Sequence, residues 1–160
     1  MTDDLTPYPP AVVAEALARA VAGDEIEAGM LLAPLIAESR PSCYALAAML
    51  AETASHIARR EQTPGTFGIT VENTVTGASG SVDVMPPDIR FAAQFVTAWA
   101  NRDQDTAQAH FDALADEAEA SDGPELVDGI LQLFAMAVTT AKAVCAEERA
   151  RRTTRTEGDT

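Results

Sequence analysis

Cysteine, lysine and aromatic residues are scarce in this chain. Its 160 residues include two cysteines, a single lysine and only 5% aromatic residues. Cys43 and Cys145 are too few and too far apart in the sequence to form a disulfide framework or a zinc knuckle. A chain of this length buries roughly 70% of its unfolded surface, so it needs no cross-link to fold. We therefore expect one domain with reduced thiols and a cytoplasmic location.

Positive charge is also in short supply. The formal net charge is −14, so there is no excess of cationic side chains to displace counterions from nucleic acid or to bind an anionic membrane surface. We find no run of about 18 apolar residues that would span a membrane. The N-terminal sequence MTDDLTPYPP lacks the basic and apolar regions of a secretory signal. We predict neither nucleic acid binding nor membrane insertion.

The sequence motifs of cofactor and metal sites are missing as well. The pattern GxxxxGK[ST] does not occur, and no GxGxxG follows a predicted strand. Asp116, Asp122 and Glu125 do not have the ligand spacing of a calcium loop. With only two histidines, a metal centre would need carboxylates from several helices. We predict no catalytic residues, no cofactor and no metal.

Alanine, the best helix former, supplies much of the apolar content. Apolar residues recur at helical spacing, while proline and glycine mark the ends of segments. The arginine and alanine bias is typical of a bacterial genome rich in G and C. Six helices are expected, over residues 9–22, 25–39, 41–60, 86–100, 105–120 and 124–152. Pro34 should kink or end the second helix. The last helix, at roughly 40 Å, is longer than a compact core of this size requires.

Residues 63–87 differ in composition from the rest of the chain. They are rich in Gly, Thr and Val, and Phe67, Ile69, Val71 and Val75 fall on one side of a two-residue alternation. The GASG sequence supplies a turn, so the segment is typical of a β-hairpin. An isolated hairpin is marginally stable in water. It should therefore pack on the helices or pair with a second copy.

Two segments of the sequence, one in each half of the chain, align with each other. Residues 14–35 align with residues 93–114 without a gap, and the alignment pairs Asp24 with Asp103 and Ala28 with Ala107. Duplication and convergence on one helix-pair geometry both explain the match. We interpret the polar corner at residues 101–105 as a turn between helices.

The predicted fold is mainly α, a helical bundle of about six helices in two three-helix units, with one β-hairpin inserted between them. A single domain, residues 1–152, comprises a first helical unit (8–62), the hairpin insert (63–87) and a second helical unit (88–152). Residues 153–160, which contain no apolar side chain, form a predicted disordered tail.

One segment of the chain carries only negative charge. Between His110 and Lys142 there is no basic residue, and the acids are Asp112, Asp116, Glu117, Glu119, Asp122, Glu125 and Asp128. This pattern is typical of a solvated helix face, and it also suits docking of a basic protein partner. Arginines gather at the other end, at Arg149, Arg151, Arg152 and Arg155. They can meet the acidic segment of the same chain or of a second copy.

Two further groups of residues are candidates for sites. An apolar pocket between helices is predicted from Met30, Leu31, Pro34, Trp99 and His110. His110 with Asp103 and Asp112, or Glu52 with His56, would supply acid–base chemistry. For His110, the alternative interpretation is a partly buried residue at a contact between helices.

Three functions follow from these patterns. The first is a non-enzymatic helical protein-interaction or regulatory protein that forms homo-oligomers. The alternative is a helical domain that binds or senses a small molecule. The third is an enzyme with an acid–base site near His110, which rests only on the presence of suitable residue types.

Overall fold

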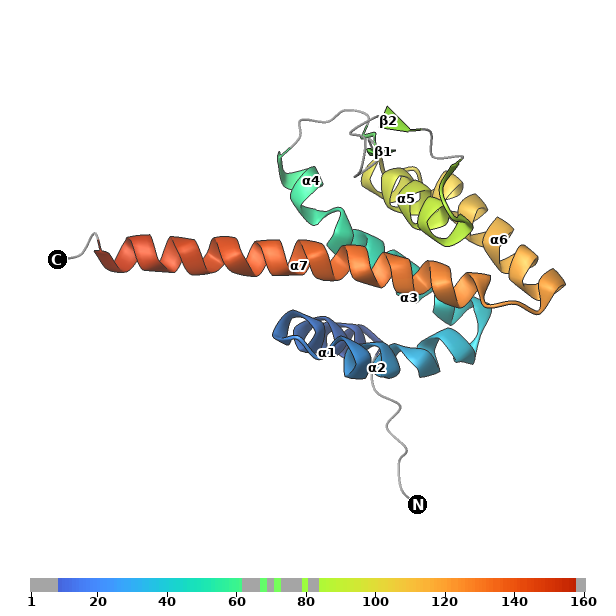
Figure 1. The fold of residues 1–160 in the computed structure, drawn as a ribbon, viewed down its shortest axis with the longest axis horizontal. Coiled ribbons are helices and arrows are strands. Elements are labelled where there is room, and N and C mark those ends of the chain that lie inside the picture. Colours follow the sequence, from blue (N-terminus) through green and yellow to red (C-terminus); the bar gives the residue numbers. More distant parts are fainter. Residues whose placement is uncertain (1–8, 62–66, 69–70, 73–78, 81–83, 158–160) are drawn as a thin grey trace, which may run out of the picture.

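The chain is mainly helical, as predicted. The computed structural model describes residues 9–61, 67–68, 71–72, 79–80 and 84–157. The helices are α1 (Pro9–Ala22), α2 (Glu25–Glu38), α3 (Arg40–Ala54), α4 (His56–Glu61), α5 (Pro87–Ala100), α6 (Gln104–Ser121) and α7 (Glu125–Glu157), as Figure 1 shows. Strands β1 (Val71–Glu72) and β2 (Ser79–Gly80) have two residues each.

The long helix α7 organises the bundle. With 33 residues it is about 50 Å long, and it packs against α1, α3, α5 and α6. Figure 1 shows α1 and α2 on one side of α7 and α5 and α6 on the other, with the C-terminal end of α7 extending beyond all of them. By length and composition alone, Glu125–Arg155 would also qualify as a membrane span. That is weak evidence, because the core helix of a soluble protein passes the same test.

Alanine allows the helices to approach closely, as the composition predicts. Ala16, Ala28, Ala47 and Ala107 are fully buried, in one core with larger side chains such as Phe95 and Leu46. Small side chains bring helix backbones together, so that the larger residues fill the remaining space.

The third predicted helix differs from the structure, whereas the second has nearly its predicted bounds. The third predicted helix, residues 41–60, is divided at Ser55 into α3 and α4, which gives seven helices in the described residues in place of about six. The buried Ser55 hydroxyl donates to the Ala51 carbonyl oxygen at 2.7 Å. Pro34 does not end α2, which continues to Glu38. Pro34 is exposed, so the Met30 carbonyl that loses its helical partner can be hydrated.

The predicted β-hairpin over residues 63–87 is not seen in the described residues. They contain only one short antiparallel pair, in which Val71 is opposite Gly80 and Glu72 is opposite Ser79. Residues 63–66, 69–70, 73–78 and 81–83 of the prediction, which include Ile69 and Val75, lie outside the described part. A two-stranded unit of this kind contributes little stability without further strands.

The chain also differs from the prediction at its C-terminal end. The predicted disordered tail, residues 153–160, is helical as far as Glu157, and residues 158–160 lie outside the described part. The hydroxyls of Thr153 and Thr154 donate to the carbonyl oxygens one turn earlier, at 3.1 and 3.0 Å. Extending an existing helix needs no new nucleation, so this polar segment continues α7.

The α1–α2 and α5–α6 corners have the same backbone geometry. Each contains one residue with positive φ, Gly23 at 105° and Arg102 at 61°. The amide of each donates to the carbonyl three residues earlier, at 3.1 and 3.0 Å. The next amides, of Asp24 and Asp103, donate to the carbonyl five residues earlier, both at 2.9 Å. The sequence alignment therefore pairs equivalent positions of two helix-ending turns.

Candidate functional site

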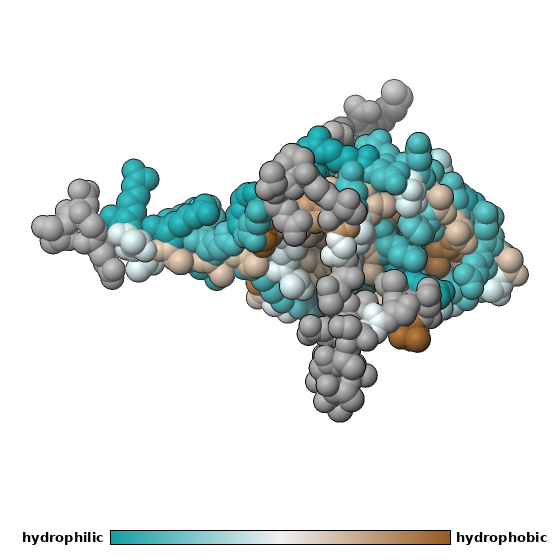
Figure 2. All heavy atoms as spheres, turned by 90° about the horizontal axis from the view of Figure 1, so that it is seen from above, coloured by the Kyte–Doolittle hydropathy of each residue, from teal (hydrophilic) through white to brown (hydrophobic). Residues whose placement is uncertain are grey.

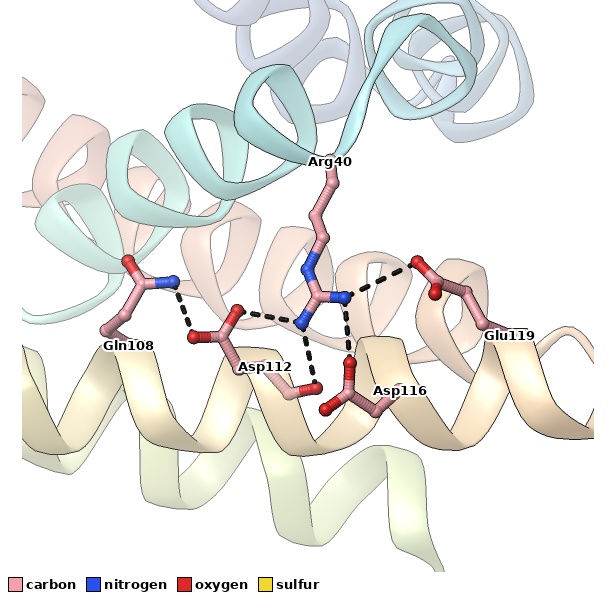
Figure 3. A network of polar contacts seen from close by, with 5 residues as sticks. All are labelled: Arg40, Gln108, Asp112, Asp116 and Glu119. Carbon is pink, nitrogen blue, oxygen red and sulfur yellow. Dashed lines mark hydrogen bonds and ion pairs between the residues drawn. The ribbon is translucent and has the colours of Figure 1, made fainter.

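Part of the acidic segment is held by an arginine from the other half of the chain. Arg40, at the start of α3, donates to Asp112 at 2.9 Å, to Asp116 at 2.8 Å and to Glu119 at 3.4 Å (Figure 3). These hydrogen bonds raise the pKa of Arg40, with Asp116 contributing most. Gln108 and Arg40 both donate to Asp112 and lower its pKa. Three of the predicted docking acids therefore connect α6 to α3 within one chain.

The other acids of the segment are placed differently. Glu125 is half-buried, and its carboxylate accepts a hydrogen bond from Ser121 at 3.1 Å. Glu117, Asp122 and Asp128 are exposed, and the structure gives them no ion pair among the described residues. Asp122 ends α6 with a left-handed backbone, φ 52°. Unbalanced negative charge is thus concentrated where α6 ends and α7 begins.

An apolar groove of about 690 Å³ lies at the same end of the bundle. It is lined by α2, by the last turns of α6 and by the first turns of α7. Four large apolar side chains on its walls remain in solvent, with exposed fractions of 82% for Ile26, 63% for Met30, 41% for Val127 and 39% for Leu131. Contiguous exposed apolar surface of this kind marks binding sites.

The shape and charge of the groove follow from its smallest and its charged residues. Gly29 and Ala33 on α2 and Ala115 and Ala118 on α6 all line the groove, so little side-chain volume fills it. Glu119 and Asp122 also line the groove, and none of its lining residues is basic. The groove is therefore mostly apolar, with the carboxylates of Glu119 and Asp122 on its α6 side.

His110 lies in a second, smaller pocket. About 280 Å³ in volume, it lies between α5 and α6 and is lined by Asp103, Thr106 and His110 among others. Asp103 caps α6 by accepting from the Thr106 amide at 3.1 Å and from its hydroxyl at 2.7 Å. These hydrogen bonds lower the Asp103 pKa, and the nearby charge of His110 adds to the effect. The structure thus brings Asp103 to His110, whereas Asp112 turns to Arg40.

Trp99 and Glu52 connect α5 to α3. The Trp99 indole N–H donates to Glu52 at 2.8 Å, and Arg59 donates to the same carboxylate at 2.6 Å. Both interactions lower the Glu52 pKa, that of Trp99 contributing most. Glu52 and His56 line a third pocket, of about 320 Å³, which also contains Cys145 from α7. The sequence did not place Cys145 near His56, because the residues are far apart along the chain.

The five residues of the predicted pocket do not line one common pocket in the structure. Met30 lines the groove, Leu31 packs against the core and Pro34 is exposed on α2. Trp99 contacts Glu52, and His110 lines the smaller pocket. Among the described residues, no group of three or more His, Cys, Asp and Glu side chains is arranged to hold a metal ion.

The asparagine of the corner bonds to the backbone of Phe67. The Asn101 side chain accepts from the Phe67 amide at 2.6 Å and donates to the Phe67 carbonyl at 3.2 Å. This pair of hydrogen bonds connects Phe67 to the end of α5. Asn101 therefore has a structural role, which agrees with interpreting the corner as a turn.

The groove is the site that the geometry favours. Sequence reasoning found Met30 but not the wall formed by α7, because Val127 and Leu131 belong to a stripe that also supplies the core. No protein-family model matches this chain, and no curated protein and no solved structure is significantly similar to it.

Proposed function

We propose that this chain is a non-enzymatic helical protein-interaction protein that forms homo-oligomers and binds protein segments in the α2–α6–α7 groove. One observation supports this above all: four large apolar side chains surround the groove and remain exposed. When an apolar groove binds an amphipathic helix, the groove residues are buried beneath apolar side chains that recur at helical spacing along the bound helix. Fully burying one of them stabilises a complex by about 1.5–3 kcal/mol.

The three carboxylates that the sequence offered for acid–base chemistry already have structural partners, which supports a non-enzymatic role. Asp103 caps α6, Glu52 accepts from Trp99 and Arg59, and Asp112 accepts from Arg40. A general base needs a free lone pair directed toward its substrate.

A small apolar ligand is the second candidate occupant. The groove volume of about 690 Å³ lies within the range of roughly 300–1,000 Å³ that is usual for ligand pockets. Ile26 and Met30 stand out into solvent at 82% and 63% exposure, and a small ligand within the groove would cover little of them. A protein surface would bury both, so we favour protein as the ligand.

The test replaces the two most exposed groove residues. A variant with Ile26→Gln and Met30→Gln should lose self-association in sedimentation velocity experiments, and also the capture of partners from lysate. Val84→Gln is the matched control, because Val84 is 79% exposed and does not line the groove. It should behave like the wild type.

Either of two results would refute the proposal. A wild-type protein that is monomeric at high micromolar concentration and captures no protein has no interaction to explain. A groove variant that associates as well as the Val84→Gln control would place the interaction elsewhere. Thermal stabilisation of the monomer by apolar small molecules, abolished in the groove variant, would support the second candidate.

A further inference from the structure

We propose that the groove receives the projecting C-terminal end of α7 from a second copy, so that copies associate head to tail. This inference rests on the proposed function and names the occupant of the groove. It is argued from the exposure of the α7 end, its shape, its charge and its position in the molecule.

The C-terminal end of α7 extends beyond the helices that pack on the rest of α7. Ion pairs join α7 to the body at Lys142 with Glu25, at 2.9 Å, and at Glu147 with Arg60, at 3.0 Å. Residues 148–155 are all exposed, and Figures 1 and 2 show this end extending alone from the bundle with mostly hydrophilic side chains. A short helical end gains most of its stability from packing, so a partner surface would stabilise it.

One face of this end carries small side chains that allow close contact with the groove. Ala143, Ala146 and Ala150 are exposed and lie on the same side of the helix, since they are three and four residues apart. Small side chains allow two helices to approach closely. The groove has small residues at Gly29 and Ala33, so the two surfaces can come into close contact between the larger groove walls.

The charges are complementary. Four arginines lie in the last turns of α7, and Arg149 and Arg155 have no ion pair among the described residues. Asp122 lines the groove without an ion pair among the described residues, and Glu119 lines it while paired with Arg40 at 3.4 Å. None of the lining residues is basic. Two groove faces brought together would place like charges in contact, which costs stability, whereas the arginine end opposite the groove brings unlike charges together.

The two surfaces lie at opposite ends of the same helix. Val127 and Leu131 line the groove, and Arg149 lies 18 residues beyond Leu131, or roughly 27 Å along a straight helix. A molecule therefore cannot fill its own groove with its own α7 end. The contact joins two different surfaces, and repetition gives a ring or an open filament, depending on the rotation between copies.

The experiment mixes two variants that fail for different reasons. The groove variant carries Ile26→Gln and Met30→Gln and keeps an intact α7 end. The end variant carries Arg149→Glu and Arg155→Glu and keeps an intact groove. Each should associate roughly tenfold or more weakly than the wild type, a loss of about 1.4 kcal/mol or more. An equimolar mixture should form a heterodimer in native mass spectrometry, since one intact groove meets one intact end.

A control separates the local effect from net charge. Arg19→Glu with Arg90→Glu changes the formal charge by the same amount, but on α1 and α5, away from the α7 end. This control should associate like the wild type, and circular dichroism should show that all variants keep their helix content. A mixture that stays monomeric would overturn the head-to-tail inference. An end variant that associates normally while the groove variant does not would overturn this inference and leave the proposed function intact.

Discussion

Two glycines within helices provide a matched test of how closely α7 packs. Replacing a glycine by alanine inside a helix stabilises the protein by about 1 kcal/mol where there is space for the added methyl group. At Gly29 in α2, an added Cβ atom would meet nothing within 4 Å. At the buried Gly129 in α7 it would lie 2.7 Å from a Leu114 methyl carbon and 2.8 Å from the Phe91 ring. The same chemical change therefore meets opposite surroundings.

The magnitudes follow from these distances. Gly29→Ala should raise the free energy of unfolding by nearly 1 kcal/mol. At Gly129 the Leu114 methyl can rotate, but the Phe91 ring packs against Phe95 at 5.5 Å between centroids. Overpacking costs about 1–3 kcal/mol, so Gly129→Ala should lower the free energy of unfolding by about 0–2 kcal/mol after the gain in helix propensity.

Urea denaturation followed by circular dichroism measures both values. Low protein concentration keeps association from contributing, which matters because Gly29 lines the groove. Equal m-values in the two variants would show that the extent of unfolding is unchanged. If Gly129→Ala stabilised the protein as much as Gly29→Ala, α7 would not approach α5 and α6 as closely as described.

Two substitutions and one labelling experiment test single residues. Arg102→Gly should raise the free energy of unfolding by up to about 1 kcal/mol in urea denaturation, because Arg102 has φ 61° and only glycine adopts this conformation without steric cost. Trp99→Phe should raise the Glu52 pKa toward its ordinary value, measured by carboxyl NMR titration, since the indole hydrogen bond is the main cause of the lowering. The wild-type contribution is full above the ordinary Glu pKa and is lost as pH falls through the lowered value, so the variant should show a weaker loss of stability at acid pH. Burial raises the Cys43 pKa to about 11. Alkylation of the native protein at mildly alkaline pH should therefore modify Cys145 alone, as detected by mass spectrometry. Modification of Cys43 at the same rate would contradict its burial.

Helix positions were predictable because local residue types specify them. Proline opens α1 and α5, and Gly23 ends α1, as the pattern predicts. The break at Ser55 was not predictable, because Ser55 turns the chain by packing in the core and by bonding the preceding turn. No residue near it carries a strong stop signal. Of the two predicted effects of Pro34, ending the helix was wrong, since the cost of an internal proline depends on whether the freed carbonyl reaches water.

The groove could not be predicted, because α2 is apolar on both faces. Leu32 and Leu35 turn into the core, while Ile26 and Met30 turn outward. Periodicity indicates a helix but does not say which apolar face is covered when both could be.

The partner of the acidic segment could not be predicted from the sequence either. The spacing of Asp112, Asp116 and Glu119 places them on one face of α6. Their partner Arg40 lies more than 70 residues away in the chain, and only the folded structure brings it there.

Salt dependence tests whether the arginines at the end of α7 take part in self-association. Each copy carries a formal charge of −14, so at very low salt, where the screening length is about 30 Å at 0.01 M, long-range repulsion between copies opposes association. Near physiological salt the length falls to about 8 Å, which screens this repulsion more than the contact between the arginine end and the groove. At 1 M the screening length is about 3 Å, and the contact between the arginine end and the groove is weakened too.

Self-association of the wild type in sedimentation experiments should therefore pass through a maximum with increasing salt. For the variant with Arg149→Glu and Arg155→Glu only repulsion remains to be screened, so its weak association should rise steadily. A wild type whose association also rises steadily would be held together by apolar contacts alone, and the arginines would have no part in it.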